Sequence, residues 1–201
     1  MLLGKGANQR IRVVVFGLVL VTISSAFVVH EMRLPAVEPD VDMLEPGDII
    51  FVDLYQGWCT TCYWDHLAIY VGSEGGAAGY PGPAVVEATF NAGVVLTPLW
   101  SFLHRDRPAE MSVRRLGHVP NRNQIIKAAI TYAVEQVGKP FDCTAHVTTV
   151  PHKIDESNHH CTELVWRSYK AGGLDLDRND GPLVYSEDIY FSPKLTAVDG
   201  S

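Results

Sequence analysis

The stretch HLAIYV at residues 66–71, which Gly72 ends, decides the fold class. Its aliphatic, β-branched and aromatic residues are typical of a buried strand, and one polar residue, His66, stands at its start. A similar run at residues 49–52 follows a turn signal, EPGD. The other candidate strands are residues 84–89, 94–96 and 111–116.

Helical spacing begins only after these strands. Between residues 124 and 137, apolar residues recur at intervals of three and four until GKP at residues 138–140 ends the pattern. Residues 161–171 form a second helical pattern, which Cys161 opens and a Gly-Gly pair ends. Strands first and helices second predict an α+β fold, an antiparallel sheet with helices packed on one face.

The composition describes a globular protein with one domain. The chain has 201 residues, of which 47% are hydrophobic and 19% charged, and this excludes a disordered chain. A net charge of −7 argues against nucleic acid as the main partner, because phosphate binding needs clustered Lys and Arg.

The first 30 residues predict export. Basic residues precede an apolar run at residues 13–29, the order of a signal or membrane anchor. The run is shorter than the roughly 20 apolar residues of a typical span, and Ser24-Ser25-Ala26 is an acceptable cleavage site, so both fates stay open. We therefore expect a linker at residues 31–44 and an extracytoplasmic domain at residues 45–201, either anchored to the membrane or secreted.

Cys161 is the candidate nucleophile. A cysteine that opens a helix lies at the positive end of the helix dipole beside unpaired backbone N–H groups, and both favour the thiolate. The same N–H groups can hold an oxyanion during acyl transfer. The alternative is a buried apolar cysteine or one half of a disulfide.

His66 and Glu87 are the candidate base and its partner. His66 stands where a sheet can present a base to a cleft, and Glu87 lies within the apolar strand that follows. A carboxylate in such a run is costly to bury unless it is paired. If the two strands are neighbours, Glu87 can accept a hydrogen bond from His66 and fix its tautomer. The alternative is that Glu87 faces solvent.

Six segments carry a family resemblance: PGDII (46–50), DHLAIYVG (65–72), VVEA (85–88), GKPFD (138–142), CTELVW (161–166) and SEDI (186–189). Together they resemble the YiiX/YebB-like proteins, which belong to the circularly permuted branch of the papain-like NlpC-type cysteine peptidases. The resemblance implies a permuted papain-like fold with Cys161 as nucleophile, His66 as base and Glu87 as the group that orients the base. The order His, acid, Cys is what the permutation implies.

The pair Cys59-x-x-Cys62 departs from this pattern. With His66 it could bind a metal if Cys161 or one of His152, His159 and His160 added a fourth ligand. It could also be a redox pair, or a disulfide or loop staple at the edge of the cleft. We predict no cofactor and no resident metal.

These residues favour a thiol hydrolase that cleaves an amide, in a peptide or cell-wall peptide, or a lipid acyl bond through a thioacyl intermediate. Two other classes remain as alternatives: a metal- or thiol-redox protein that uses Cys59, Cys62 and His66, and a non-catalytic binding module. The sequence does not identify the substrate, because fold does not determine it.

Overall fold

The computed structural model describes residues 39–54, 63–73, 81–105, 108, 110–143 and 156–198. The expected N-terminal segment, most of the linker before residue 45, and the Cys59-x-x-Cys62 pair lie outside these residues. Among the described residues, no helix has the length and apolar character needed to cross a membrane.

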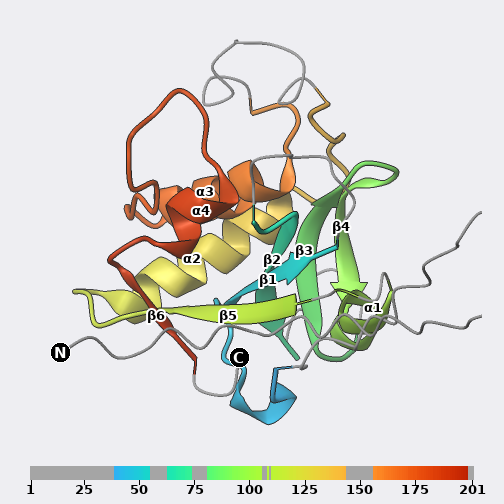
Figure 1. Ribbon diagram of the computed structural model, residues 1–201, viewed down its shortest axis with the longest axis horizontal. Helices are drawn as coiled ribbons and strands as arrows, with labels where there is room; N and C mark the ends of the chain where they lie inside the picture. The colour runs from blue at the N-terminus through green and yellow to red at the C-terminus, as the bar shows by residue number, and fades with distance from the viewer. Residues whose placement is uncertain are drawn as a thin grey trace, which may run out of the picture. The chain divides into compact units, whose positions relative to one another are not determined.

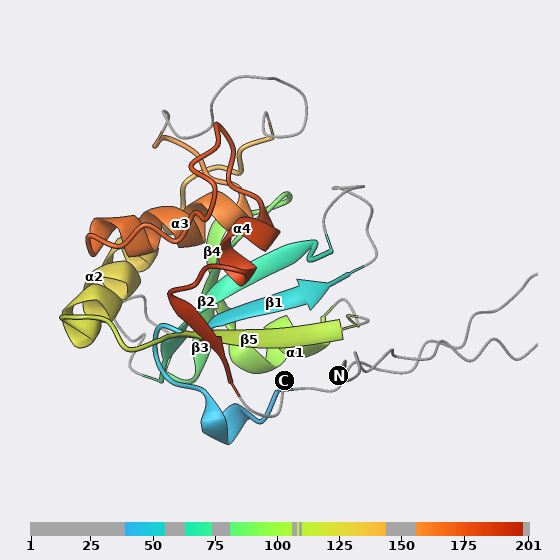
Figure 2. The same ribbon diagram turned by 60° about the vertical axis from the view of Figure 1, so that its left-hand side comes forward.

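An antiparallel sheet forms the centre of the fold (Figures 1 and 2). Its six strands have the order β4-β3-β2-β1-β5-β6, and each neighbouring pair is antiparallel. The strands are β1 (Ile49–Asp53), β2 (His66–Gly72), β3 (Ala84–Thr89), β4 (Gly93–Pro98), β5 (Glu110–Leu116) and β6 (Leu195–Ala197).

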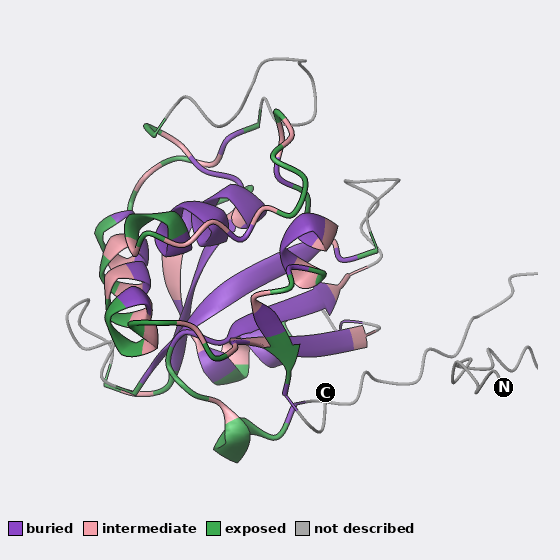
Figure 3. Ribbon diagram, turned by 90° about the vertical axis from the view of Figure 1, so that its left-hand side faces the viewer, coloured by how far each residue is buried: buried purple, intermediate pink, exposed green. Residues whose placement is uncertain are grey.

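Helices cover both faces of this sheet. The helices are α1 (Leu99–His104), α2 (Arg122–Glu135), α3 (Cys161–Ala171) and α4 (Ser186–Tyr190), and a short 3-10 helix, η1 (Val41–Met43), precedes β1. Alternate residues of β2 divide between two cores: Leu67 and Ile69 pack towards α2 and α3, while Ala68 and Tyr70 pack towards α1. Figure 3 shows the strands buried between these layers. The α+β architecture is confirmed, but the expectation that helices cover one face misses α1.

Differences from the sequence prediction concern short elements. The longest strands and α3 lie where the patterns place them, and α2 begins and ends two residues earlier than expected. Helices α1 and α4 and strand β6 were not expected. They have six, five and three residues, too few for a helical or strand period to be visible in the sequence.

The helix α3 is buried almost all round, which fixes its position. Every residue from Thr162 to Tyr169 is buried, and the hydroxyl of Tyr169 donates a hydrogen bond to the carbonyl oxygen of Gly47 beside the start of β1. One oxygen of the Glu163 carboxylate, Oε1, accepts a hydrogen bond from Nε of Arg167 one turn later, at 2.7 Å, and this ion pair lies inside the helix packing. The first residue of α3 is therefore held firmly against the sheet.

At the start of β4, Gly93 lies close to the backbone of Lys139, and this contact generates a first prediction. Gly93 has φ +72°, and an added Cβ would overlap the carbonyl oxygen of Lys139, the group that accepts a hydrogen bond from Val94 N at 2.8 Å. We expect Gly93→Ala to lower the free energy of unfolding by more than ~2 kcal/mol in urea denaturation, because strain and overlap add.

Gly138→Ala is the matched control. Gly138 also has a positive φ, +95°, but an added Cβ there meets no atom within 4 Å. Its cost is therefore backbone strain alone, about 1 kcal/mol. Equal losses in the two variants would contradict the role of the Lys139 contact.

Candidate active site

His66 occupies the first position of β2, at the end of the sheet. Its side chain lies on the same face as Ala68 and Tyr70, with its ring centroid 5.9 Å from that of Phe102 in α1. It is only 8% exposed. Its Nε2 lies 2.7 Å from Oε2 of Glu87 on the neighbouring strand. Strand β2 thus places its polar first residue, His66, against the carboxylate of Glu87.

Glu87 is completely buried in β3. Besides His66, its carboxylate accepts hydrogen bonds from Thr97 Oγ1 at 2.5 Å and from both terminal nitrogens of Arg105, at 2.6 and 2.7 Å. Burial alone would raise the pKa of Glu87, but the hydrogen bonds from His66 and Arg105 outweigh it and lower the pKa to about 2. Glu87 is therefore a buried, ionised acceptor, and the alternative of a solvent-facing carboxylate is wrong.

Cys161 is the first residue of α3, and its thiol is free. The thiol and the His66 ring act on each other directly, because each group shifts the pKa of the other. Because Nε2 of His66 faces Glu87, Nδ1 is the ring nitrogen left for the sulfur. The three residues singled out in the sequence therefore form one chain of contacts, from Glu87 through His66 to Cys161.

The electrostatics of this chain favour an ion pair. Burial raises the pKa of Cys161, but hydrogen bonds from His160 and His66 bring it well below the ordinary value of a thiol. Burial also lowers the pKa of His66, yet its hydrogen bonds with Cys161 and Glu87 raise it to about 10. Both shifts favour a thiolate beside an imidazolium over a neutral thiol beside a neutral imidazole.

His160 caps the helix that carries the thiol. It has the extended backbone of an N-cap residue, and its Nδ1 accepts a hydrogen bond from the N–H of Glu163 at 3.4 Å. The preceding His159 is fully buried, and its Nε2 lies 3.2 Å from the side chain of Gln136. The two adjacent histidines thus have different surroundings, and only His160 acts on Cys161.

Comparisons with known proteins identify the family of the chain. The sequence pattern of a family described as "Permuted papain-like amidase enzyme, YaeF/YiiX, C92 family" matches residues 43–189. The chain belongs to this family. The resemblance drawn from the six short segments is thereby confirmed.

A solved structure shares the fold of this permuted papain-like amidase. It is described as the crystal structure of metalloprotein yiiX from Escherichia coli O157:H7. The two chains are 20% identical with a TM-score of 0.57, and the match covers 78% of this chain and 97% of the other. At this identity the likeness shows the fold alone. The search of curated proteins found no match.

Three site residues of this amidase-family chain escaped the sequence analysis. Thr97 had a partial signal, because it is a polar residue after the apolar run of β4, but its contact with Glu87 depends on the register in which Glu87 pairs with Val95. Arg105 had none, since its contact depends on the short helix α1. His160 was considered only as a possible fourth ligand of a metal site, not as a cap of the helix.

The metal site that the sequence left open finds no support in the described residues. Cys59, Cys62 and His152 lie outside the described residues. Within the described part of the chain, no group of three or more His, Cys, Asp and Glu side chains could hold a metal ion. Cys143 is a free, exposed thiol.

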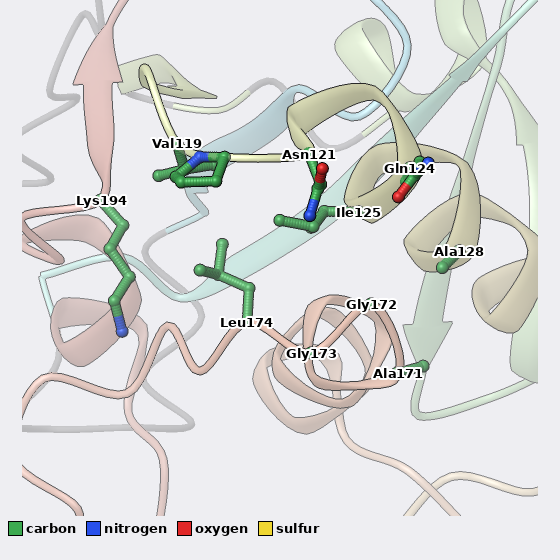
Figure 4. A pocket seen from close by; sticks show the side chains of 11 residues that line it. Val119, Asn121, Gln124, Ile125, Ala128, Ala171, Gly172, Gly173, Leu174 and Lys194 are labelled. Atoms are coloured by element: carbon green, nitrogen blue, oxygen red, sulfur yellow. The ribbon is translucent and has the colours of Figure 1, made fainter.

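A hollow lies beside the C-terminal end of α3. Its volume is about 530 Å³, and Ile125, Gly172 and Leu174 are among the residues that line it (Figure 4). Lys194, at its rim, donates a hydrogen bond to the carbonyl oxygen of Asp175. The hollow contains neither Cys161 nor His66, because the length of the helix separates it from them.

The cap generates a second prediction. His160→Ala removes both the N-cap and a hydrogen bond to the thiol, so we expect lower stability, by about 1 kcal/mol, and a higher Cys161 pKa. Stability is measured by thermal unfolding and the pKa by the pH dependence of iodoacetamide alkylation.

His160→Asn separates the two effects. Asparagine caps helices well, so this variant should recover the stability. Its side chain is shorter and should not recover the low Cys161 pKa. An unchanged alkylation profile in His160→Ala would refute the link between His160 and the thiol.

Proposed function

We propose that this protein is a cysteine amidase or peptidase that uses Cys161 as nucleophile, His66 as general base and acid, and Glu87 to orient His66. The observation that carries the proposal is the buried chain of contacts from Glu87 through His66 to the thiol at the start of α3. The family supports an amidase or peptidase in general, and the geometry supports these residues as its reactive groups.

The first half of the reaction forms a thioacyl enzyme. The Cys161 thiolate attacks the carbonyl carbon of an amide, and the electron pair of the C=O bond moves to oxygen. Backbone N–H groups at the N-terminus of α3 lie where they can stabilise that oxyanion. When the C–N bond breaks, the His66 imidazolium gives its proton to the leaving nitrogen, so the amine departs neutral.

Water completes the second half. His66, now neutral, takes a proton from a water molecule as the water attacks the thioester carbonyl. Collapse of the second oxyanion releases a carboxylic acid and returns the thiolate beside the imidazolium. Glu87 keeps its charge throughout and stabilises the positive ring by its hydrogen bond at 2.7 Å.

The substrate we propose is a peptide amide, with cell-wall peptides as the leading class. An amidase or peptidase family supports this class. Hydrolysis of a lipid acyl bond would use the same thioacyl chemistry and remains a second substrate class. The apolar run at residues 13–29 supports an extracytoplasmic location, where such cell-wall peptides are found.

Replacement of the thiol tests the function directly. We expect Cys161→Ala to abolish hydrolysis across a panel of peptide amides, cell-wall peptide fragments and acyl esters, with an unchanged thermal unfolding midpoint. Acyl-thiol-reactive probes should label Cys161 in the native protein, with the adduct located by mass spectrometry.

Cys143 is the internal control. Its thiol is exposed, so accessibility alone would make it the faster of the two to react. We expect Cys161 to react faster because its pKa lies below the ordinary thiol value. Faster labelling of Cys143 than of Cys161 would falsify the assignment of the nucleophile.

The base can be tested by its titration. The pKa of His66 is raised to about 10, so the imidazolium persists in neutral solution and loses its proton only as pH rises through that value. Glu87→Gln removes a negative charge and should move the titration to lower pH. NMR of the His66 ring follows this titration without a substrate, and a midpoint that does not move would count against the Glu87 role.

A metal-dependent function is the second candidate, favoured by the description of yiiX as a metalloprotein. The described residues do not fit this candidate well. They contain no group of three metal-binding side chains, and both ring nitrogens of His66 already face partners. Stoichiometric zinc in the purified protein that is lost in Cys59→Ser would favour it. Full Cys161 reactivity after dialysis against a chelator would favour the cysteine mechanism.

A further inference from the structure

We propose that Arg105 is a positioning residue of the same site, which fixes the orientation and the negative charge of Glu87 and so acts on His66 and Cys161 through that carboxylate. This inference rests on the proposed function. It extends the site by one residue, which lies at the end of α1 and belongs to none of the strands and helices that carry Cys161, His66 and Glu87.

The contact between Arg105 and Glu87 is bidentate. Nη1 of Arg105 donates to Oε1 at 2.7 Å, and Nη2 donates to Oε2 at 2.6 Å. Two parallel hydrogen bonds between a planar guanidinium and a planar carboxylate fix both distance and plane, which a lysine ammonium cannot do. The pair therefore determines where each oxygen of Glu87 lies.

Each Glu87 oxygen accepts two hydrogen bonds. Oε2 accepts from His66 and Arg105, and Oε1 accepts from Thr97 and Arg105. A carboxylate has about four lone-pair positions, so the carboxylate is saturated. Rotation of the Glu87 carboxylate about the Cγ–Cδ bond would break several of these hydrogen bonds at once. Arg105 is the one residue among these donors that holds both oxygens, and it therefore has the largest part in the orientation.

The charges alternate in sign along the site. Arg105 is positive, Glu87 negative, His66 positive and Cys161 negative. The charged groups that act on Glu87 are His66 from β2 and Arg105 from the segment after α1, while β4 contributes the uncharged Thr97. Without Arg105 the buried part of the site would carry a net negative charge, which is costly to bury.

The position of Arg105 gives α1 a function. The helix packs on the face of the sheet opposite α2 and α3, through Leu99 and Phe102. Arg105 is its C-cap residue, and its guanidinium lies 5.8 Å from the ring centroid of Phe102. The side chain is 32% exposed, whereas Glu87 is fully buried. The short helix thus brings a cation from the surface to a buried carboxylate.

The test measures Cys161 without a substrate. In the full-length protein, the rate of alkylation by iodoacetamide is recorded against pH, with the modified residue identified by mass spectrometry. Loss of a cation at this distance raises a carboxyl pKa by about 1–3 units. In Arg105→Gln, Glu87 then takes up a proton at a higher pH. Once Glu87 is neutral it no longer stabilises the His66 imidazolium, and the imidazolium in turn no longer stabilises the Cys161 thiolate. We expect the acid limb of the profile to move up by about one pH unit or more.

The conservative variant and the double variant identify the route. Arg105→Lys keeps the charge and should return the acid limb most of the way to its native position. In a Glu87→Gln background, Arg105→Gln should cause no further shift, because Arg105 acts through Glu87. The double variant also removes both buried partners together, so it should fold even if Arg105→Gln alone does not.

Arg115→Gln is the matched control. Arg115 makes the same kind of bidentate contact with the buried Asp48, at 2.8 Å for both bonds, and its side chain is 20% exposed. It contacts none of the three reactive residues. We expect this variant to lose stability as a broken buried pair does, but to keep the native alkylation profile.

The outcomes separate this inference from the proposed function. An Arg105→Gln profile that superimposes on the native one overturns the role of Arg105. So does an equal shift in the Glu87→Gln background or in Arg115→Gln. If Cys161 of the native protein reacts no faster than Cys143, the proposed function itself fails, whatever the variants show.

Discussion

The structure of the site depends on a carboxylate buried inside a sheet. Glu87 has no exposed surface, and a carboxylate in that position is stable only when its lone pairs are filled and its charge is balanced. Three parts of the fold meet this requirement: β2 brings His66, β4 brings Thr97, and the end of α1 brings Arg105. Strands β2 and β4 and the short helix α1 are therefore linked through the carboxylate of Glu87.

The nucleophile depends on a different constraint, the burial of α3. The residues of this helix from Thr162 to Tyr169 are all buried, so its first turn is packed into the core beside the sheet. That packing places the Cys161 thiol beside His66. A reactive group carried by a buried helix is held more precisely than one carried by a loop.

Much of this arrangement could be predicted from the sequence, and the reasons are specific. The central strands are continuous apolar runs, so their existence is visible, and the His66 and Glu87 side chains stand out because they interrupt those runs. The start of α3 at Cys161 follows from the apolar spacing beyond it. Arg105 could not be predicted, because its contact requires the β3–β4 register and a six-residue helix with no visible period. The helix on the second face was missed for the same reason.

The permuted order of the chain also sets the order in which the site is made. β2, β3 and β4 leave the ribosome first, with His66, Glu87 and Thr97, whereas α3 and the edge strand β6 come last. The edge strand β6, which completes the sheet, follows α3 in the chain. A nascent or truncated chain that ends before residue 161 therefore carries the base and the acid without the sulfur. Synthesis in this direction therefore delays the reactive thiol until the strands that carry the base and the acid have been made.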